Sequence, residues 1–273
     1  MATRLGILAG EGPLPARLMA ACRETGREFF VLAFEGHTDA SALDRAPHAW
    51  VRLGAAGTGL ELLRRAEVGD LVMAGPIARP SLASLRPDLR TAQFFTKLGS
   101  AAFGDDGLLS GVVRALEAEG FRVVGPDAIL NDLLAPLGVY GRVEPDAQAR
   151  LDIDRGVEVA RALGAKDVGQ AAVVQQGIVL GVEAAEGTDA LVARCGALRR
   201  EGPGGVLVKV RKPGQERRVD LPTIGIETVR VARAAGLRGI AVEAGGALVL
   251  DRPAVARAAD AASLFVVGVE VPK

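Results

Sequence analysis

The first half of the chain alternates short apolar runs with amphipathic stretches, and this alternation limits the possible folds more than any other feature. Expected strands cover residues 4–9, 28–34, 71–74 and 121–124, and expected helices cover residues 16–25, 59–66 and 106–119. Strands that alternate with helices are typical of a parallel sheet. We therefore expect a Rossmann-like parallel α/β domain over residues 1–133.

The pattern changes after a segment rich in glycine and proline, residues 134–150, which we expect to link two domains. Residues 151–273 predict a mixed α/β domain. Within it, Gln176-Gly177 joins two apolar runs in a predicted hairpin, and a second hairpin is predicted around Gly245-Gly246. Further helices are expected over residues 153–163, 223–235 and 253–262, and further strands over residues 206–210 and 265–269.

Composition and charge exclude several classes of function. The chain has 33 Lys and Arg and 33 Asp and Glu, so its net charge is zero and we expect no nucleic-acid partner. Cys22 and Cys195 fit neither a disulfide framework nor a metal motif, and no run has the length of a membrane span. A cytoplasmic protein is expected, with His37 and His48 as surface residues.

A glycine-rich turn follows the first expected strand and reads Gly10-Glu-Gly-Pro-Leu-Pro15. A strand, a glycine turn and a helix start together present backbone N–H groups that can bind a phosphate. Pro15, however, stands where the dinucleotide-binding fingerprint has its third glycine. A nucleotide-phosphate site and an ordinary tight turn therefore both remain open.

Two acidic segments each allow two interpretations. Asp105 and Asp106 lie at the start of an expected helix, where capping of free N–H groups is favoured over metal binding. The second segment, Glu183-Ala-Ala-Glu186-Gly-Thr188-Asp189, follows an expected strand and opens a helix, with Thr188 as the expected cap. The second segment equally fits a ligand-facing loop at a strand end.

The segment from Lys209 to Gly225 is the most informative. Cations at positions 209, 211, 212, 217 and 218 stand close to Glu216 and Asp220. Cations neutralise pyrophosphate oxygens, and an aspartate can hold a hard metal ion or orient water. The alternative is a solvated charged loop.

These motifs give the chain a resemblance to the UDP-2,3-diacylglucosamine pyrophosphatases of lipid A biosynthesis that are unrelated to metallophosphoesterases. The resemblance spans nearly the whole chain. It rests on LGILAGEGPLP from Leu5, on residues 75–80, on GDDGLL at 104–109, on EGTDAL at 186–191 and on KPGQERRVDLPTIG at 212–225. It implies hydrolysis of a lipid-linked UDP-sugar, held between two domains, to UMP and 2,3-diacylglucosamine 1-phosphate.

The resemblance also implies a cofactor, partners and site residues. Mg²⁺ is the expected cofactor, with Asp220 as catalytic residue and metal ligand and with Glu186 and Asp189 as further ligands. Substrate contacts are expected from Gly10, Gly12, Leu14, Pro15, Arg79, Thr188, Lys212, Gln215, Arg218 and Thr223. A transient contact with the cytoplasmic membrane face is expected, and a homodimer is kept open.

Two other classes of function remain as alternatives. A nicotinamide-dependent oxidoreductase would use the strand and glycine turn at the start of the chain. A non-catalytic lipid- or nucleotide-binding protein would use the same residues without turnover.

Overall fold

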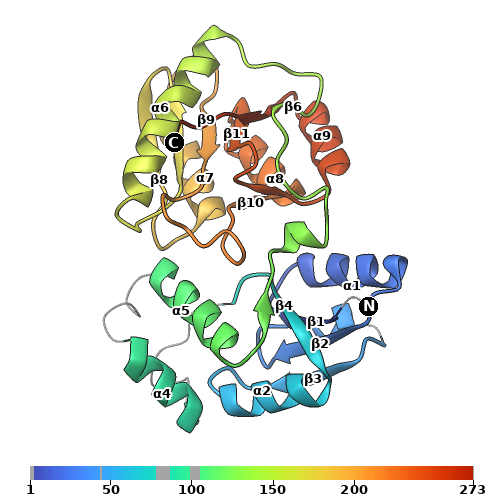
Figure 1. Cartoon of the computed structure of the whole chain (residues 1–273). Coiled ribbons are helices and arrows are strands. Elements are labelled where there is room, and N and C mark those ends of the chain that lie inside the picture. The colour runs from blue at the N-terminus through green and yellow to red at the C-terminus, as the bar shows by residue number, and fades with distance from the viewer. Residues whose placement is uncertain (1–2, 44, 78–86, 99–104, 273) are drawn as a thin grey trace. The chain divides into compact units, whose positions relative to one another are not determined.

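The computed structural model describes residues 3–43, 45–77, 87–98 and 105–272, and the chain divides into two compact units (Figure 1). The first unit comprises Met1–Leu130 together with Glu216–Asp220. The second comprises Asn131–Gln215 and Leu221–Lys273, and so includes residues 134–150. Five residues from late in the sequence therefore belong to the unit that the first 130 residues build.

Five parallel strands form the sheet of the first unit, in the spatial order β3-β2-β1-β4-β5. Their bounds are β1 Arg4–Ala9, β2 Phe29–Phe34, β3 His48–Val51, β4 Val68–Ala74 and β5 Arg122–Val123. The order reverses between β1 and β4, which makes the carboxyl ends of these two strands a topological switch point. Open α/β sheets bind ligands at such points. The predicted Rossmann-like architecture is confirmed.

Helices α1 Leu14–Thr25, α2 Ala56–Arg65 and α5 Asp105–Ala118 bury apolar side chains in the core of this unit. The unit also contains α4 Leu89–Leu98 and the short 3₁₀ helices η1 Ala40–Leu43 and η3 Pro126–Ala128. Helix α1 buries Leu14, Leu18 and Cys22, spaced so that they share one face. A core cluster joins Leu71 of β4 with Val113 of α5, which fixes that helix on the sheet.

Six strands form the larger sheet of the second unit, in the order β6-β13-β11-β9-β7-β8. Their bounds are β6 Gly138–Val139, β7 Ala171–Gln175, β8 Ile178–Val182, β9 Val206–Lys209, β11 Gly239–Glu243 and β13 Phe265–Val269. The central strands β13, β11 and β9 are parallel, and the outer pairings are antiparallel. This is the predicted mixed α/β architecture, and the hairpin across Gln176-Gly177 is confirmed.

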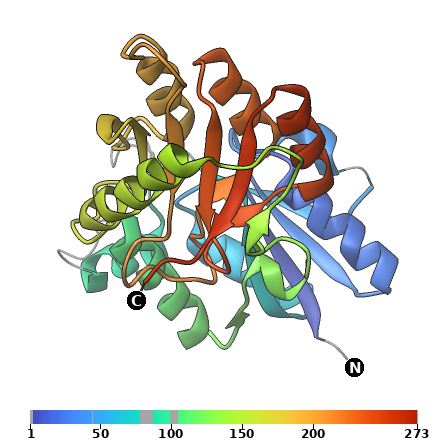
Figure 2. The same ribbon diagram turned by 90° about the horizontal axis from the view of Figure 1, so that it is seen from above.

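Helices cover this second sheet unevenly (Figure 2). Helices α7 Thr188–Gly196, α8 Ile226–Ala234 and α9 Arg252–Ala261 share one core cluster with the sheet, whereas α6 Ala147–Gly164 packs into a different cluster. Alternate residues of the strands enter the two clusters: Leu207 joins the first and Val208 the second. Both faces of the central strands are therefore buried, as in other parallel sheets.

The hairpin predicted around Gly245-Gly246 is wrong. Strand β11 lies between two parallel neighbours, and β12 (Leu248–Val249) pairs instead with β10 (Thr223–Ile224) in a separate small sheet. The chain leaves β11 without turning back beside it, because the Ala244 N–H donates to the Val269 carbonyl and the Gly245 N–H donates to the Ala135 carbonyl. The glycines thus mark a strand exit and not a two-strand turn.

Two smaller differences also come from tertiary pairing. The helix predicted from Thr223 begins at Ile226, because Thr223–Ile224 form β10. Strand β3 was not predicted, because its sequence, HAWV, is short and lies at the sheet edge. Among the described residues, no helix is long and apolar enough to cross a lipid bilayer.

Candidate functional site

The turns after β1 and β4 touch each other at the switch point of the first sheet. The Gly10 N–H donates to the Ala74 carbonyl at 2.7 Å, and the Glu11 N–H donates to the Pro76 carbonyl at 2.9 Å. Gly75 has a φ of 86°, and a Cβ there would overlap the carbonyl oxygen of Glu11. Only glycine fits this backbone contact. The sequence therefore places a required glycine at the point where such sheets bind ligands.

The predicted phosphate turn has fewer N–H groups to offer than its glycines suggest. Those of Gly10 and Glu11 are already bonded to carbonyls, and two of its other residues are prolines. Leu14 and Pro15 are buried in the unit, whereas Gly12 is exposed with a φ of 82°. Any ligand contact from this turn therefore comes from backbone atoms near Gly12 and the start of α1.

The loop of residues 216–220 is held in the first unit by a three-residue ion cluster. Arg218 donates to both oxygens of Glu216 at 2.9 Å, through Nε and through a terminal nitrogen. Its other terminal nitrogen donates to Oε1 of Glu117, at the end of α5, at 2.5 Å. The guanidinium predicted to bind pyrophosphate is thus occupied by two carboxylates.

Charge pairing shifts the ionisation of this cluster. The Arg218 guanidinium holds the pKa of Glu216 below its usual range. In turn, Glu216 and then Glu117 raise the pKa of Arg218. Glu216 and Arg218 are therefore both charged at neutral pH. By formal charge, the cluster of one guanidinium and two carboxylates has one net negative charge.

Asp220 ends this loop and is half-buried. The N–H groups of Val219 and Asp220 both donate to the Glu216 carbonyl, at 3.2 and 3.1 Å. Val219 packs against the core cluster of the first unit. The position of the Asp220 backbone is therefore fixed by a tight turn, an apolar contact and the Arg218 ion cluster.

A second polar cluster lies at the edge of the larger sheet where β9 and β8 end. Lys209, Lys212, Gln215 and Glu183 are all less than 9% exposed there. Burial of charged side chains is unfavourable unless they are paired, and such groups concentrate at functional sites. This edge is also where the parallel strands of an α/β sheet present ligand-binding loops.

The cations of this cluster have defined partners. Nζ of Lys209 donates to the Thr223 carbonyl at 3.1 Å. Nζ of Lys212 lies 2.7 Å from Oδ1 of Asp167, and its backbone N–H donates to Oε1 of Gln215 at 3.1 Å. The structure thus gathers three predicted substrate-binding residues, Lys212, Gln215 and Thr223, around the start of one loop.

Glu183 organises the acidic segment beside this loop. Its carboxylate accepts from Oγ1 of Thr188 at 2.5 Å and from the Gln170 N–H at 3.0 Å. Thr188 was predicted to cap the next helix, and that prediction is wrong: the cap is Gly187. The hydroxyl of Thr188 donates to Glu183 instead, which is a stronger, charge-assisted bond.

The predicted metal ligands do not form a ready-made cage. The backbone N–H of Glu186 and the side chain of Arg194 hold the pKa of Glu186 below its usual range. The Glu186 and Arg194 side chains form an ion pair at 2.9 Å. Asp189 is exposed on the first turn of α7, and Asp220 belongs to the other compact unit. Among the described residues, no three His, Cys, Asp or Glu side chains are grouped as a metal site.

Several other candidate residues have a simpler account. Arg79 lies outside the described residues, as do the side chains of Asp105 and Asp106, although α5 begins at Asp105. Burial raises the pKa of Cys22 and of Cys195, so neither thiol is an activated nucleophile.

The two histidines differ from each other. His48 is exposed, as predicted, and its Nδ1 lies 2.8 Å from the Ala46 carbonyl oxygen. Nδ1 of His37 is buried and has no hydrogen-bond partner among the residues that the structure describes. His37 is therefore less of a surface residue than its polar neighbours in the sequence suggest.

Sequence reasoning missed Glu117 and gave no role of its own to Glu183, the first residue of the acidic segment. The place of Glu183 at the end of a predicted strand was an available signal. Glu117 offered none, because its partner Arg218 stands 101 residues later in the chain.

Family models match both halves of the chain. The model of the LpxI N-terminal domain matches residues 4–133, and that of the LpxI C-terminal domain matches residues 136–267. The chain belongs to the LpxI family. An LpxI relative from Caulobacter vibrioides, described as UDP-2,3-diacylglucosamine pyrophosphatase LpxI, is 44% identical over 98% of each chain.

Solved structures give only weak likenesses to this LpxI family member. CobK precorrin-6A reductase is 14% identical with a TM-score of 0.34, over all of this chain and 89% of the other. Glycinamide-RNase-transformylase T from Mycobacterium tuberculosis is 18% identical with a TM-score of 0.24, over 66% of this chain and 43% of the other. Neither likeness bears on the function.

Proposed function

We propose that this protein hydrolyses UDP-2,3-diacylglucosamine to UMP and 2,3-diacylglucosamine 1-phosphate in lipid A biosynthesis. The observation that carries the proposal is the 44% identity to an LpxI pyrophosphatase over 98% of both chains, with both family domains present. One feature of each unit supports the proposal: the first has a Rossmann-type switch point, and the second has the buried lysines Lys209 and Lys212.

In this reaction a water oxygen bonds to one phosphorus of the pyrophosphate, and the bond from that phosphorus to the bridging oxygen breaks. The bridging oxygen leaves with the other phosphate, and the proton of the attacking water must be accepted. Asp220 is our candidate for the group that orients this water, because its backbone is fixed by the hydrogen bond from its N–H to the Glu216 carbonyl. Lys212, held beside Gln215, is our candidate for stabilising phosphoryl charge.

Mg²⁺ fits this reaction as an ion shared between protein and substrate. Proteins commonly bind Mg²⁺ through one or two carboxylates together with substrate phosphates and water. Glu186 is the weakest of the predicted ligands, because Arg194 already neutralises it. We therefore assign Asp220 as the principal protein ligand and Asp189 as a secondary one. When bound, the ion would neutralise charge on the pyrophosphate oxygens.

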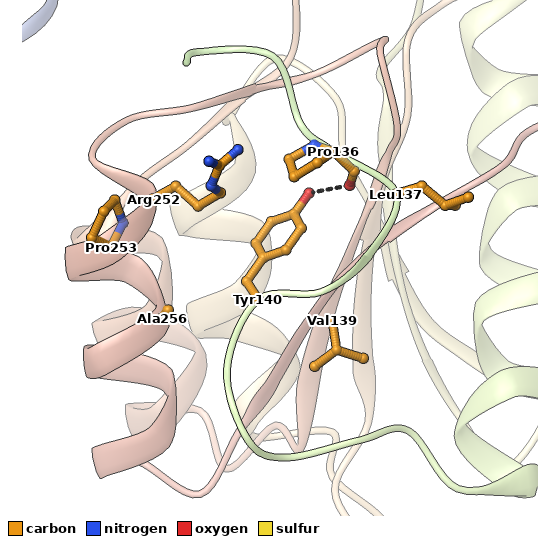
Figure 3. Close-up of a pocket in the computed structure, with 7 residues that line it drawn as sticks. All are labelled: Pro136, Leu137, Val139, Tyr140, Arg252, Pro253 and Ala256. Atoms are coloured by element: carbon orange, nitrogen blue, oxygen red, sulfur yellow. Dashed lines mark hydrogen bonds between the residues drawn. The ribbon is translucent and has the colours of Figure 1, made fainter.

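Membrane contact is the finer part of the proposal, and a small apolar pocket in the second unit suits it (Figure 3). The pocket is lined by Pro136, Leu137, Val139, Tyr140, Arg252, Pro253 and Ala256. Leu137 is 62% exposed, and the Tyr140 hydroxyl donates to the Pro136 carbonyl at 3.0 Å, so the ring edge is fixed. The Arg252 guanidinium, which also lines the pocket, could contact anionic headgroups while the exposed Leu137 side chain enters the lipid.

Vesicle sedimentation tests this contact. We expect the protein to sediment with phosphatidylglycerol vesicles more than with phosphatidylcholine vesicles, and Leu137→Ser and Arg252→Gln to weaken the binding. Leu198→Ser, at an exposed leucine after α7, serves as the matched control. Equal loss from Leu137→Ser and Leu198→Ser would show that the pocket is not the contact surface. Sedimentation velocity of the free protein tests whether it forms the homodimer that the sequence leaves open.

UMP release from UDP-2,3-diacylglucosamine, with and without Mg²⁺, tests the activity. We expect metal-dependent release that falls by at least roughly a hundredfold in Asp220→Asn, which keeps the shape of the side chain and removes its charge. Asp189→Asn should retain most of the activity. Equal release from wild type and Asp220→Asn would remove Asp220 from the chemistry. Tight binding without release would favour a carrier, and neither binding nor release would refute the proposal.

A further inference from the structure

Arg218 makes its strongest contacts with protein carboxylates. Both oxygens of Glu216 accept from it in a two-pronged pair, and Glu117 accepts from its remaining terminal nitrogen. Two-pronged contacts between arginine and carboxylate are among the strongest hydrogen bonds in proteins. The Arg218 side chain is also only 37% exposed. Its conformation is therefore set within the first unit.

The cluster around Arg218 is a poor site for an anion. One guanidinium and two carboxylates leave a net negative charge, so a pyrophosphate placed there would be repelled by Glu117 and Glu216. Binding it would also require breaking the contacts that orient Arg218. The geometry does not suit the phosphate-binding role expected for Arg218 from the family resemblance.

The same contacts suit a mechanical role. Glu117 stands at the end of α5, a helix anchored in the core through Val113. The Glu117–Arg218 ion pair ties residues 216–220 to that helix, and Val219 adds an apolar contact with the same core. Asp220 is the next residue, and its N–H is bonded back to the Glu216 carbonyl.

We propose that Glu117 is a positioning residue of the hydrolase, which acts through Arg218 to hold the loop that presents Asp220. This inference rests on the function proposed above, because it gives Asp220 the catalytic role. Arg218 then belongs to the support of the site and does not contact the substrate. Loss of the Glu117 charge frees one end of Arg218, so the loop can shift relative to α5.

Steady-state kinetics of UMP release separate this role from phosphate binding. We expect Glu117→Gln to lower kcat by roughly ten- to a hundredfold with little change in KM, since a shift of about 1 Å at a catalytic group has effects of that size. Arg218→Gln should act in the same direction. The double variant should be no worse than Arg218→Gln, because Arg218→Gln already breaks the contact with Glu117. If Arg218 bound phosphate instead, Arg218→Gln would mainly raise KM and Glu117→Gln would have little effect.

Glu119→Gln is the matched control. Glu119 follows α5 directly and pairs with Arg64 and Arg90, away from the loop. Its loss should leave kcat unchanged. An equal fall in kcat from Glu119→Gln and Glu117→Gln would mean that general weakening of α5 causes the effect, and would overturn the proposal.

Limited trypsin digestion measures how accessible residues 216–220 are to cleavage, and it needs no substrate of the enzyme. Arg217 is exposed within it, and we expect cleavage after Arg217 to be several-fold faster in Glu117→Gln than in wild type or Glu119→Gln. Unchanged cleavage would refute the tie between Glu117 and the loop, even for a protein that releases no UMP. An active wild type with an unaltered kcat in Glu117→Gln would refute the positioning role alone, whereas an inactive wild type would refute the proposed function.

Discussion

The contact between the turns after β1 and β4 predicts a graded response to alanine at three glycines. Gly12 and Gly75 have almost the same φ, 82° and 86°, but a Cβ at Gly12 would have no neighbour within 4 Å, whereas one at Gly75 would overlap the Glu11 carbonyl. Gly10 has no positive φ, yet a Cβ there would overlap the carbonyl of Pro76. The three positions thus separate backbone strain from steric contact.

The magnitudes follow from this separation. Gly12→Ala should destabilise the first unit by about 1 kcal/mol, the strain of a left-handed backbone for alanine. Gly75→Ala adds the steric overlap, which forces the turns apart and weakens the bonds from Gly10 and Glu11, each worth about 1 kcal/mol. We therefore expect a loss of about 3 kcal/mol for Gly75→Ala. Gly10→Ala, which has the overlap alone, should lose about 2 kcal/mol.

Urea unfolding followed by tryptophan fluorescence measures this series directly. Trp50 is the single tryptophan of the chain and lies on β3, so its emission reports the first unit. Unfolding free energies for Gly12→Ala and Gly75→Ala that agree within about 0.5 kcal/mol would refute the backbone contact at the switch point. A Gly75→Ala protein with the unfolding free energy of wild type would also show that this position does not require glycine.

Three further predictions concern single side chains. Because Arg218 lowers the pKa of Glu216, that pair stabilises the fold above the ordinary carboxyl pKa and stops doing so as the pH falls through the lowered value. The stability difference between wild type and Glu216→Gln, on the order of 1 kcal/mol at neutral pH, should therefore begin to shrink in urea titrations as the pH falls below the ordinary carboxyl value of about 4. It should vanish only below the lowered pKa of Glu216. A difference that persists in acid would contradict the ion pair. Asp152→Ala should cost about 3 kcal/mol in unfolding followed by circular dichroism, because the buried carboxylate accepts from the N–H groups of Gln176 and Gly177; a loss below 1 kcal/mol would contradict this. Gln176→Asn should raise stability by roughly 0.5 kcal/mol, since both turn residues have positive φ and asparagine tolerates that conformation better; a loss of stability would count against the turn type.

Most of the fold could be predicted from the sequence, because local patterns determine it. The strand of residues 4–9, the helix of α5 and the Gln176-Gly177 hairpin each follow from apolar spacing and one turn signal. The failures involve competition between partners. Gly245-Gly246 satisfies the local rule for a hairpin. Strand β11, however, is paired with β9 on one side and with β13 on the other, so neither of its edges is left for a hairpin partner.

The candidate site was predictable in its residue types and less so in its pairing. The cationic segment after β9 was recognisable, and two of its predicted contact residues, Lys212 and Gln215, are hydrogen-bonded to each other. Sequence could not show that Arg218 is paired with Glu117, because the partners are 101 residues apart and are brought together only by the tertiary fold. The role of an arginine depends on which carboxylate pairs with it in the folded protein, and local sequence spacing does not show this.

The membership of residues 216–220 in the first unit has a consequence for the order of folding during synthesis. The ribosome delivers residues 1–130 first, and domains tend to fold as they emerge. Here that early intermediate lacks the segment that supplies Val219 to its core and Arg218 to Glu117. The first unit can reach its final state only after more than 80 further residues, counted from Leu130 to Glu216, have been made. A truncated chain that ends at residue 130 should therefore be less stable than the same segment within the full protein, and the loop of residues 216–220 would be among the last parts to reach its final conformation.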